Sequence, residues 1–314
     1  MAEITRRQLA QGAIAAGALA GAAPMATAAS GLELRQLGKT GMKVGVLGIG
    51  TSPFGRPDVT QADVNNMVSR AAELGINYLD AAPIYRQAER RLGPALKGKR
   101  DKFVLVTKVE STSKQDATWQ VEESLQKMQT DYFDLVHIHN VGRTDRFPSL
   151  DILLGEDGAL QGLRDLKKKG VVKHIGMTCH LRPKRALPVL NMGDIEAVMC
   201  AANFVDNHIY DFEGTVFSAA AKKGLGVVAM KILGGSVNDG PPLLLDHYER
   251  AVRYALGIPG LSVAIMGMKS IAEMDNAFKT VTAYKALKGS EKMELSELGK
   301  KMAADWGQHR GPAV

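Results

Sequence analysis

The amino-acid sequence predicts an α/β fold, a (β/α)8 TIM barrel that follows a short N-terminal β-hairpin. After residue 32, β-branched runs alternate with amphipathic stretches whose apolar residues have helical spacing. Eight such pairs recur at intervals of roughly 25 to 35 residues, which suits eight equivalent barrel units. Several helical stretches are followed by a glycine, as at Gly75 and Gly170, which is typical of a left-handed helix cap. A doubly wound sheet would show the same alternation, but Pro53 breaks the G-x-G-x-x-G pattern expected after its first strand.

The order of the predicted elements follows from this alternation. Residues 32–37 and 42–47 are predicted to form the hairpin around Gly38-Lys39-Thr40-Gly41, and we expect it to close one end of the barrel. The predicted strands are residues 44–50, 77–82, 103–109, 133–139, 174–179, 197–203, 226–232 and 262–267. The predicted helices include residues 61–74, 118–128, 160–169, 212–223 and 243–256. The chain beyond residue 281 is helix-like and charged, and could cover a pocket.

Composition excludes several classes of protein. With 45% hydrophobic and 23% charged residues, the chain is neither collagen-like nor disordered. The two cysteines, Cys179 and Cys200, are too few for a disulfide framework, and we expect both to be free thiols. The formal charge is +7, but basic residues are spread along the chain rather than clustered in a stripe. We therefore expect no nucleic-acid partner.

The first thirty residues differ in composition from the rest. The pair Arg6-Arg7 precedes an Ala/Gly-rich apolar run over residues 10–23 and the small-residue segment Ala26-Thr27-Ala28. This order predicts a twin-arginine (Tat) export signal over residues 1–30, with the Tat export machinery as a partner and a periplasmic or otherwise exported location. The run is too short and too weakly apolar for a stable membrane span. Residues 31–314 are then expected to form one barrel domain.

Polar residues occur where several predicted strands end. Asp80 ends the second strand, Tyr85 follows five residues later, Lys108 lies on the third strand, and His137 and His139 lie on the fourth. Burying such groups is costly unless they pair. In barrels of this type the chemistry lies at the carboxyl ends of the strands, so these residues are predicted to form a site.

Three of these segments resemble motifs of the aldo-keto reductase family. Residues 80–93 read D-A-A-P-I-Y-R-Q-A-E-R-R-L-G, residues 103–108 resemble the family's lysine strand, and residues 134–139 resemble its histidine strand. The resemblance implies hydride transfer between a nicotinamide cofactor and a small aldehyde, ketone or sugar carbonyl.

The resemblance also assigns a role to each catalytic residue. Tyr85 would be the general acid, and the ammonium group of Lys108 would make its proton easier to surrender. Asp80 would keep Lys108 charged, and His139 would donate a hydrogen bond that orients the carbonyl.

The same resemblance implies a set of cofactor contacts, with NADP as the expected cofactor and NAD possible. Met230 stands where an aromatic ring often stacks on the nicotinamide, and Met199 where a glutamine is usual. Lys269 and Ser270 would grip a 2′-phosphate, but the arginine usual one helical turn before Asn276 is Ala272 here. The full set is Gly50, Thr51, Thr178, Cys179, Met199, Met230, Lys231, Leu233, Gly234, Gly267, Lys269, Ser270 and Asn276.

Two other functions remain open from the sequence. The chain could be a non-catalytic barrel that binds a nucleotide. Alternatively, His137 and His139 project to the same side of their strand and could bind the metal of a hydrolase, if other strands supply a further ligand. If neither histidine binds metal, His137 is expected to be an interior histidine with its hydrogen bonds satisfied. The long connection over residues 140–158 is a candidate lid.

Overall fold

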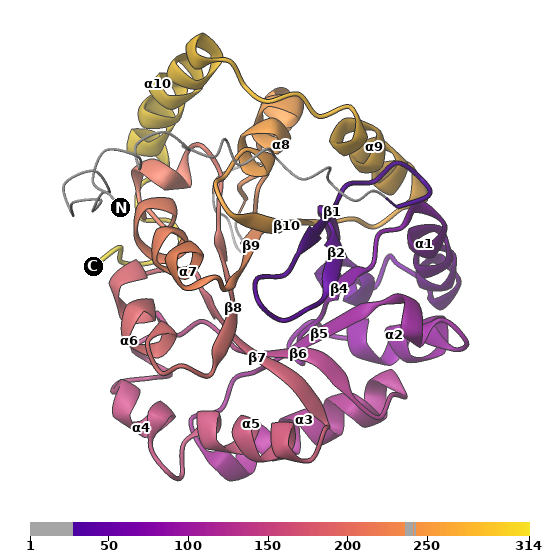
Figure 1. Ribbon diagram of the computed structural model, residues 1–314. Helices are drawn as coiled ribbons and strands as arrows, with labels where there is room; N and C mark the ends of the chain where they lie inside the picture. The colour runs from indigo at the N-terminus through magenta and orange to yellow at the C-terminus, as the bar shows by residue number, and fades with distance from the viewer. Residues whose placement is uncertain (1–27, 236–240, 242) are drawn as a thin grey trace, which may run out of the picture.

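Eight parallel strands close into a barrel in the computed structural model, which describes residues 28–235, 241 and 243–314 (Figure 1). The strands are β3 (Leu47–Gly50), β4 (Tyr78–Asp80), β5 (Val104–Val109), β6 (Phe133–Ile138), β7 (Val172–Cys179), β8 (Ile195–Ala201), β9 (Gly226–Met230) and β10 (Leu261–Gly267). They pair in chain order, and β10 closes the ring against β3. The predicted (β/α)8 barrel is confirmed. The twin-arginine motif lies in residues 1–27, outside the described part of the chain.

The N-terminal hairpin consists of β1 (Leu34–Gln36) and β2 (Lys43–Gly45), which pair antiparallel. Leu37 and Val44 are fully buried and pack against residues of the barrel interior, so the hairpin closes one end of the barrel, as predicted. Its turn requires glycine at position 38, where φ is +54° and a Cβ atom would lie 2.2 Å from the backbone nitrogen of Gly226. The second hairpin strand and the first barrel strand were predicted to overlap, but β2 ends two residues before β3 begins.

Helices surround the barrel (Figure 1). They are α1 (Gln61–Leu74), α2 (Ala88–Leu96), α3 (Lys114–Met128), α4 (Leu150–Leu154), α5 (Ala159–Lys168), α6 (Ala186–Leu190), α7 (Ser218–Lys223), α8 (Tyr248–Leu256), α9 (Ile271–Thr282) and α10 (Gly289–Trp306). Short 3-10 turns lie at Ser52–Gly55, Arg100–Lys102, Pro183–Arg185, Asp206–His208 and Leu245–His247. Among the described residues, no helix is long and apolar enough to cross a membrane.

Some helix boundaries followed the predictions, whereas α3, predicted from residue 118, begins at Lys114 after its cap residue Ser113. Helix α1 has the predicted bounds because Thr60 and Asp63 form a capping box at its start and Gly75 ends it with φ of 72°. The helix predicted over residues 212–223 is a π-helical turn at Glu213–Phe217 followed by α7. The helix predicted from residue 243 begins only at Tyr248. Helices α2, α4 and α6 were not predicted; all three are short, α2 and α6 each contain a proline, and α4 lies within the connection predicted as a lid.

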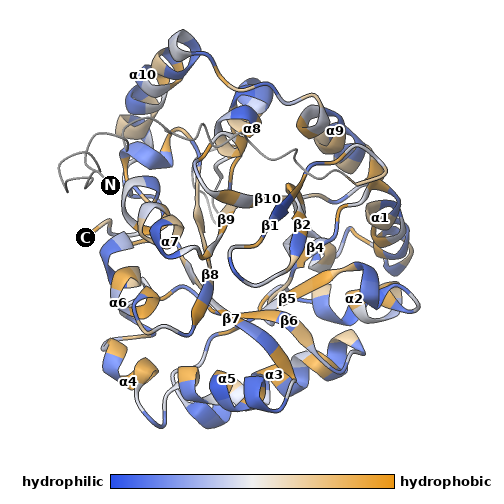
Figure 2. Ribbon diagram, in the orientation of Figure 1, coloured by the Kyte–Doolittle hydropathy of each residue, from blue (hydrophilic) through white to orange (hydrophobic). Residues whose placement is uncertain are grey.

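The hydrophobic core has two layers separated by the strands. One cluster fills the barrel interior and includes Tyr78, Leu135 and Met199, while a larger cluster packs the outer face of the strands against the helices. In Figure 2 the strands are largely hydrophobic and the helices carry hydrophilic residues as well. Because successive side chains of a strand face opposite sides, alternate residues enter the two layers. Cys179 and Cys200 lie opposite each other on β7 and β8, and both are buried free thiols, as predicted.

Candidate active site

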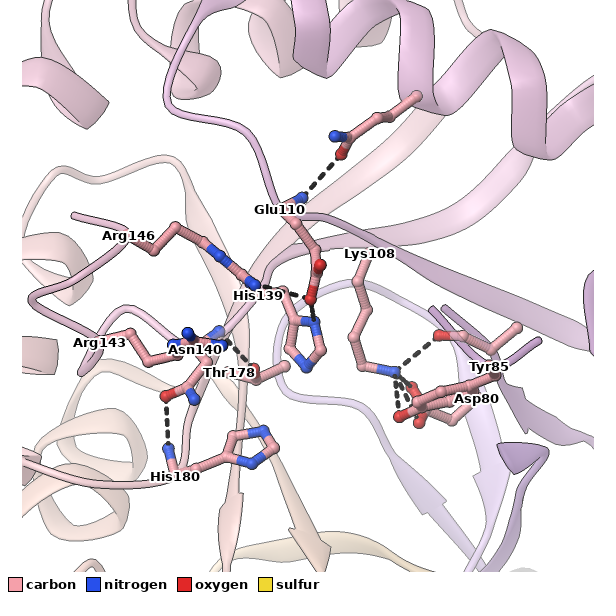
Figure 3. Close-up of polar contacts among 12 residues, drawn as sticks. Asp80, Tyr85, Lys108, Glu110, His139, Asn140, Arg143, Arg146, Thr178 and His180 are labelled. Atoms are coloured by element: carbon pink, nitrogen blue, oxygen red, sulfur yellow. Dashed lines mark hydrogen bonds and ion pairs between the residues drawn. The ribbon is translucent and has the colours of Figure 1, made fainter. Parts of the chain in front are cut away.

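The ammonium group of Lys108 is the centre of a buried polar network at the carboxyl ends of β4 and β5 (Figure 3). Its Nζ donates to both carboxylate oxygens of Asp80, at 2.7 and 2.8 Å, and to the carbonyl oxygen of Ala81 at 2.6 Å. The hydroxyl oxygen of Tyr85 lies 3.2 Å from the same nitrogen. The structure therefore brings together the three residues that the sequence places on two separate strands and a loop.

Backbone contacts hold this network in place. Thr51, at the end of β3, uses both its backbone nitrogen and its Oγ1 to bond the carbonyl oxygen of Asp80, each at 2.9 Å. The turn that carries Tyr85 packs closely against Gly55, where an added Cβ atom would lie 1.9 Å from the carbonyl oxygen of Tyr85. Tyr85 is partly exposed, whereas Asp80 and Lys108 are about 1% exposed. Tyr85 is thus the most exposed of the three residues.

Burial and charge oppose each other in this network. Burial lowers the pKa of Lys108, but Asp80 and Tyr85 outweigh it and leave that pKa above its ordinary value. For Tyr85, burial raises the pKa; Lys108 lowers it, but the nearby carboxylate of Asp80 adds to the rise. The net pKa of Tyr85 is raised. The predicted contact with Lys108 is confirmed, but the expectation of an acidified phenol is wrong in this state of the protein because burial dominates.

His139 lies beside this network and is paired with an acid that the sequence analysis did not single out. Its Nδ1 is 2.6 Å from Oε1 of Glu110, the residue that directly follows β5. Nη1 of Arg146 is 2.8 Å from the same oxygen, so the connection predicted as a lid is tied to the site. Burial lowers the pKa of His139 to about 4, and its ring is neutral at neutral pH.

Neighbouring backbone also shapes the mouth of the barrel. Asn140 has a positive φ of 59°, and its backbone nitrogen donates to Oγ1 of Thr178 at 2.8 Å. Oδ1 of Asn140 accepts from the backbone nitrogen of His180 at 3.1 Å. The rings of His139 and His180 meet edge to face, with centroids 5.4 Å apart. Thr178 thus faces the site, as predicted, but its hydroxyl is already engaged.

His137 lies deeper in the barrel than His139. It is fully buried, and neither ring nitrogen has a hydrogen-bond partner among the residues that the structure describes. Gly176 makes room for it, since a Cβ atom there would lie 2.4 Å from Nδ1 of His137. The interior position was predicted, but the expectation that its hydrogen bonds are satisfied is wrong. No group of three or more His, Cys, Asp or Glu side chains that could hold a metal ion occurs within the described residues, so the hydrolase alternative has no third ligand there.

The predicted cofactor residues on β7, β8 and β9 divide between the two core layers. Met199 and Met230 belong to the interior cluster, and Met230 lies nearer the mouth because it pairs with Ala201 whereas Met199 pairs with Val228. Cys179 instead belongs to the outer cluster, and its Sγ is 3.0 Å from the carbonyl oxygen of Leu181. The placement of Cys179 on the cofactor face is wrong, because alternation along β7 turns Thr178 inward and its neighbour outward.

The loop after β9 has the backbone expected of a phosphate-binding segment. Lys231 and Gly234 have positive φ values of 56° and 71°, and the backbone nitrogen of Gly234 donates to the carbonyl oxygen of Lys231 at 2.8 Å. Burial lowers the pKa of Lys231 to about 7, with a further lowering from Arg310. Leu233 is partly buried against the hydrophobic clusters. The loop therefore combines a poorly solvated amine with a tight backbone turn in which Gly234 is buried.

The second predicted phosphate segment lies where β10 meets α9. Ser270 caps α9 through the backbone nitrogen of Glu273 at 3.2 Å, and Lys269 is exposed. Oε2 of Glu273 accepts from the backbone nitrogen of Lys269 at 2.9 Å, so a carboxylate already occupies this helix N-terminus. Gly50 and Gly267 lie opposite each other on β3 and β10. Asn276 is exposed on α9.

A buried ion pair near Lys231 was missed by sequence reasoning. Asp206 accepts from Arg310, which the C-terminal segment brings to the mouth, and from Nδ2 of Asn203 at 2.7 Å. The same Nδ2 donates to the carbonyl oxygen of Lys231 at 3.1 Å. Nη1 of Arg310 is buried and has no hydrogen-bond partner within residues 28–235 and 243–314. No local sequence motif identifies Arg310 as a site residue. Glu110, by contrast, could have been predicted as a site residue, because it lies two residues after Lys108 at the same strand end.

The chain is similar to known proteins both in sequence and in fold. The model of the aldo/keto reductase family matches residues 46–240. The chain is 27% identical to L-galactose dehydrogenase from Arabidopsis thaliana, over 85% of this chain and 93% of that protein. An aldo-keto reductase from Bacillus halodurans, in its holo form, has a TM-score of 0.71 and 26% identity, covering 89% of this chain and all of that one.

A further solved structure bears on the fold alone. The aldo/keto reductase from Klebsiella pneumoniae in complex with NADP and acetate has a TM-score of 0.68 and 21% identity, covering 85% of this chain and 95% of that one.

Proposed function

This chain belongs to the aldo/keto reductase family and is an NAD(P)-dependent oxidoreductase, and we propose that it uses NADP(H) to interconvert a small aldehyde, ketone or sugar carbonyl with its alcohol. The observation that carries the proposal is the contact of Lys108 with both Asp80 and Tyr85 at the open end of the barrel. A non-catalytic nucleotide-binding barrel would have no need to bury this charged set.

Tyr85 is the proton donor in the proposed reaction. A carbonyl oxygen gains negative charge as its carbon accepts hydride, and it needs a donor in the transition state. Because its pKa is raised, Tyr85 is a protonated phenol at neutral pH and can donate. The ammonium of Lys108, 3.2 Å from the phenol oxygen, then stabilises the phenolate that remains. Asp80 keeps Lys108 charged and fixed in position.

The residues around the mouth fit a dinucleotide with phosphate groups. In the described part of the chain, Nη1 of Arg310 is buried without a partner and the amine of Lys231 lies in the same charged cluster, so an anion there would pair with both. Lys231 and Gly234 would hold the pyrophosphate, with Met230 beside the nicotinamide. Lys269 and Ser270 would hold a 2′-phosphate once Glu273 moves from the helix N-terminus. When bound, the nicotinamide supplies or accepts the hydride.

The substrate class and the location complete the proposal. A sugar is supported by the similarity to L-galactose dehydrogenase.

The Arg6-Arg7 motif supports Tat export to the periplasm, and we propose that the cofactor binds before export and stays bound. Replacing both arginines by lysine should keep the protein in the cytoplasm, as measured by cell fractionation. Protein purified from the periplasm without nucleotide and with weak affinity for it would contradict retention of the cofactor.

Tyr85→Phe tests the proposed reaction. The variant should lose carbonyl reduction, followed by nicotinamide absorbance, while its Kd for NADPH stays nearly unchanged. Tyr132→Phe is the matched control, because Tyr132 precedes β6 at the opposite end of the barrel and should retain full activity. Turnover by Tyr85→Phe at the wild-type rate would exclude the phenol as the proton donor. A wild-type protein that binds NADPH but reduces no aldehyde or sugar would favour the non-catalytic barrel.

A further inference from the structure

Glu110 is held on three sides at the edge of the active site. Its Oε1 lies 2.6 Å from Nδ1 of His139 and 2.8 Å from Nη1 of Arg146. Its backbone nitrogen donates to Oε1 of Gln120 at 2.7 Å. The side chains of Glu110 and His139 are 15% and 6% exposed. Figure 3 shows the carboxylate between the arginine and the imidazole, with the second ring nitrogen of His139 pointing away from it.

The charge on Glu110 decides which nitrogen of His139 carries hydrogen. An ionised carboxylate can only accept hydrogen bonds, so Nδ1 of His139 must be the donor. Although burial opposes it, the contacts with His139 and Arg146 lower the pKa of Glu110 to about 2, which keeps the carboxylate ionised. Lys108 and Arg146 also disfavour a second proton on the imidazole. The neutral ring therefore has its lone pair on Nε2.

We infer that Glu110 is a positioning residue that fixes His139 as a hydrogen-bond acceptor toward the substrate, so that the site selects compounds with a hydroxyl group at that point. This inference rests on the proposed function and revises the expected role of His139 as a donor to a carbonyl oxygen.

The preference follows from hydrogen-bond chemistry. A hydroxyl next to the carbonyl can donate to Nε2 of His139 while the carbonyl oxygen accepts from Tyr85. A carbonyl oxygen has no hydrogen, so by itself it can accept from Tyr85 but places a lone pair against Nε2. The favoured ligands are therefore carbonyl compounds with an adjacent hydroxyl, such as sugars. A simple aldehyde lacks the second contact.

The tautomer is measurable without turnover. In full-chain protein with ¹⁵N-labelled histidine, the ring resonances of His139 are assigned by their loss in His139→Gln. At pH 7 we expect the hydrogen on Nδ1 and a non-protonated Nε2. In Glu110→Gln, whose amide can donate or accept, the population with hydrogen on Nε2 should rise. A wild-type spectrum with hydrogen on Nε2 would overturn the inference, whether or not the protein has reductase activity.

Kinetics test the selection of hydroxyl groups. Glu110→Gln should lower kcat/KM about tenfold or more for reduction of a sugar, relative to reduction of an aldehyde without a hydroxyl. Glu196→Gln is the matched control, because Glu196 pairs with Nδ1 of His174 at 2.7 Å near the start of β7 and β8, away from the site. It should leave the ratio unchanged. An equal loss on both substrates in Glu110→Gln would contradict selection, whereas absence of all nicotinamide-linked turnover in the wild type would contradict the proposed function alone.

Discussion

Arg310 donates two hydrogen bonds to the same oxygen of Asp206, from Nε at 2.9 Å and Nη2 at 2.7 Å. The two side chains are 2% and 1% exposed, although they lie 104 residues apart in the sequence. The pair fastens the C-terminal segment to the mouth of the barrel, beside the loop that carries Lys231. Arg310 therefore belongs both to a structural ion pair and to the proposed cofactor site.

Breaking this pair should be costly. Asp206→Ala leaves a buried guanidinium without its counter-ion and should lower the free energy of unfolding by about 3–5 kcal/mol. The double variant with Arg310→Met should lose less than the sum of the single changes, as measured by urea denaturation. Arg250→Ala provides a control, since its 3.8 Å contact with Glu294 is largely exposed and should contribute less than about 1 kcal/mol. Additive losses at Asp206 and Arg310 would show that the two do not interact.

His137→Leu should stabilise the protein. The imidazole is fully buried with no hydrogen-bond partner in the part of the chain that the structure describes, and a leucine of similar size removes that desolvation cost. We expect the free energy of unfolding to rise by about 1 kcal/mol, with unchanged reductase activity. Loss of activity in a stably folded variant would instead assign a chemical role to His137 and revive the metal-site alternative.

His139 should make stability depend on pH. Its pKa is about 4 in the folded protein and 6.5 in the unfolded chain, so below pH 6.5 the unfolded chain binds a proton that the folded protein does not. Stability should therefore fall as pH falls from 6.5 toward 4, by up to about 3 kcal/mol. Because other buried histidines titrate in the same range, the measured quantity is the difference between wild type and His139→Gln in urea denaturation. The measurement is made between pH 7 and 4.5, where Glu110 stays mostly ionised and contributes little to the difference. A difference that does not change with pH would contradict this assignment.

Lys231 should couple cofactor binding to proton uptake. Its pKa of about 7 leaves the amine mostly neutral at pH 8.5, and a bound phosphate group would favour the charged form. Binding of NADPH at that pH should then take up as much as about one proton, and the Kd should rise as pH increases above 7. Calorimetry in two buffers with different ionisation enthalpies measures this uptake. Lys231→Met should abolish it, and uptake that persists in this variant would assign the proton to another group.

The fold and the centre of the site were predictable because both depend on local patterns. Apolar runs alternating with helical stretches specify the barrel, and the positions of Asp80 and Lys108 at strand ends place them on one face. The same alternation would have excluded Cys179 from the cofactor face, since it follows the inward-facing Thr178. The partners of His139 and the pair of Arg310 with Asp206 depend on how distant loops pack, and no spacing in the sequence reports that.

The direction in which the pKa of Tyr85 shifts could not be predicted from the sequence, because it depends on how deeply the side chain is buried. A nearby ammonium was foreseen, but the extent of burial was not, and burial is the larger effect. Helices α2 and α6 themselves were not predicted, because a proline within each weakens the helical pattern of the sequence.

The attachment of the C-terminal segment also governs how the protein is best handled. The backbone nitrogen of Arg182 donates to the carbonyl oxygen of Pro312 at 3.0 Å, so the last residues lie beside the loops that follow β7 and β8. The first described residues lie at the other end, where Ser30 donates to the carbonyl oxygen of Leu74 at 2.6 Å. An affinity tag fused after Val314 would therefore emerge beside the loops that follow β7 and β8, and a linker between the tag and Val314 should be long enough to keep the tag away from the mouth.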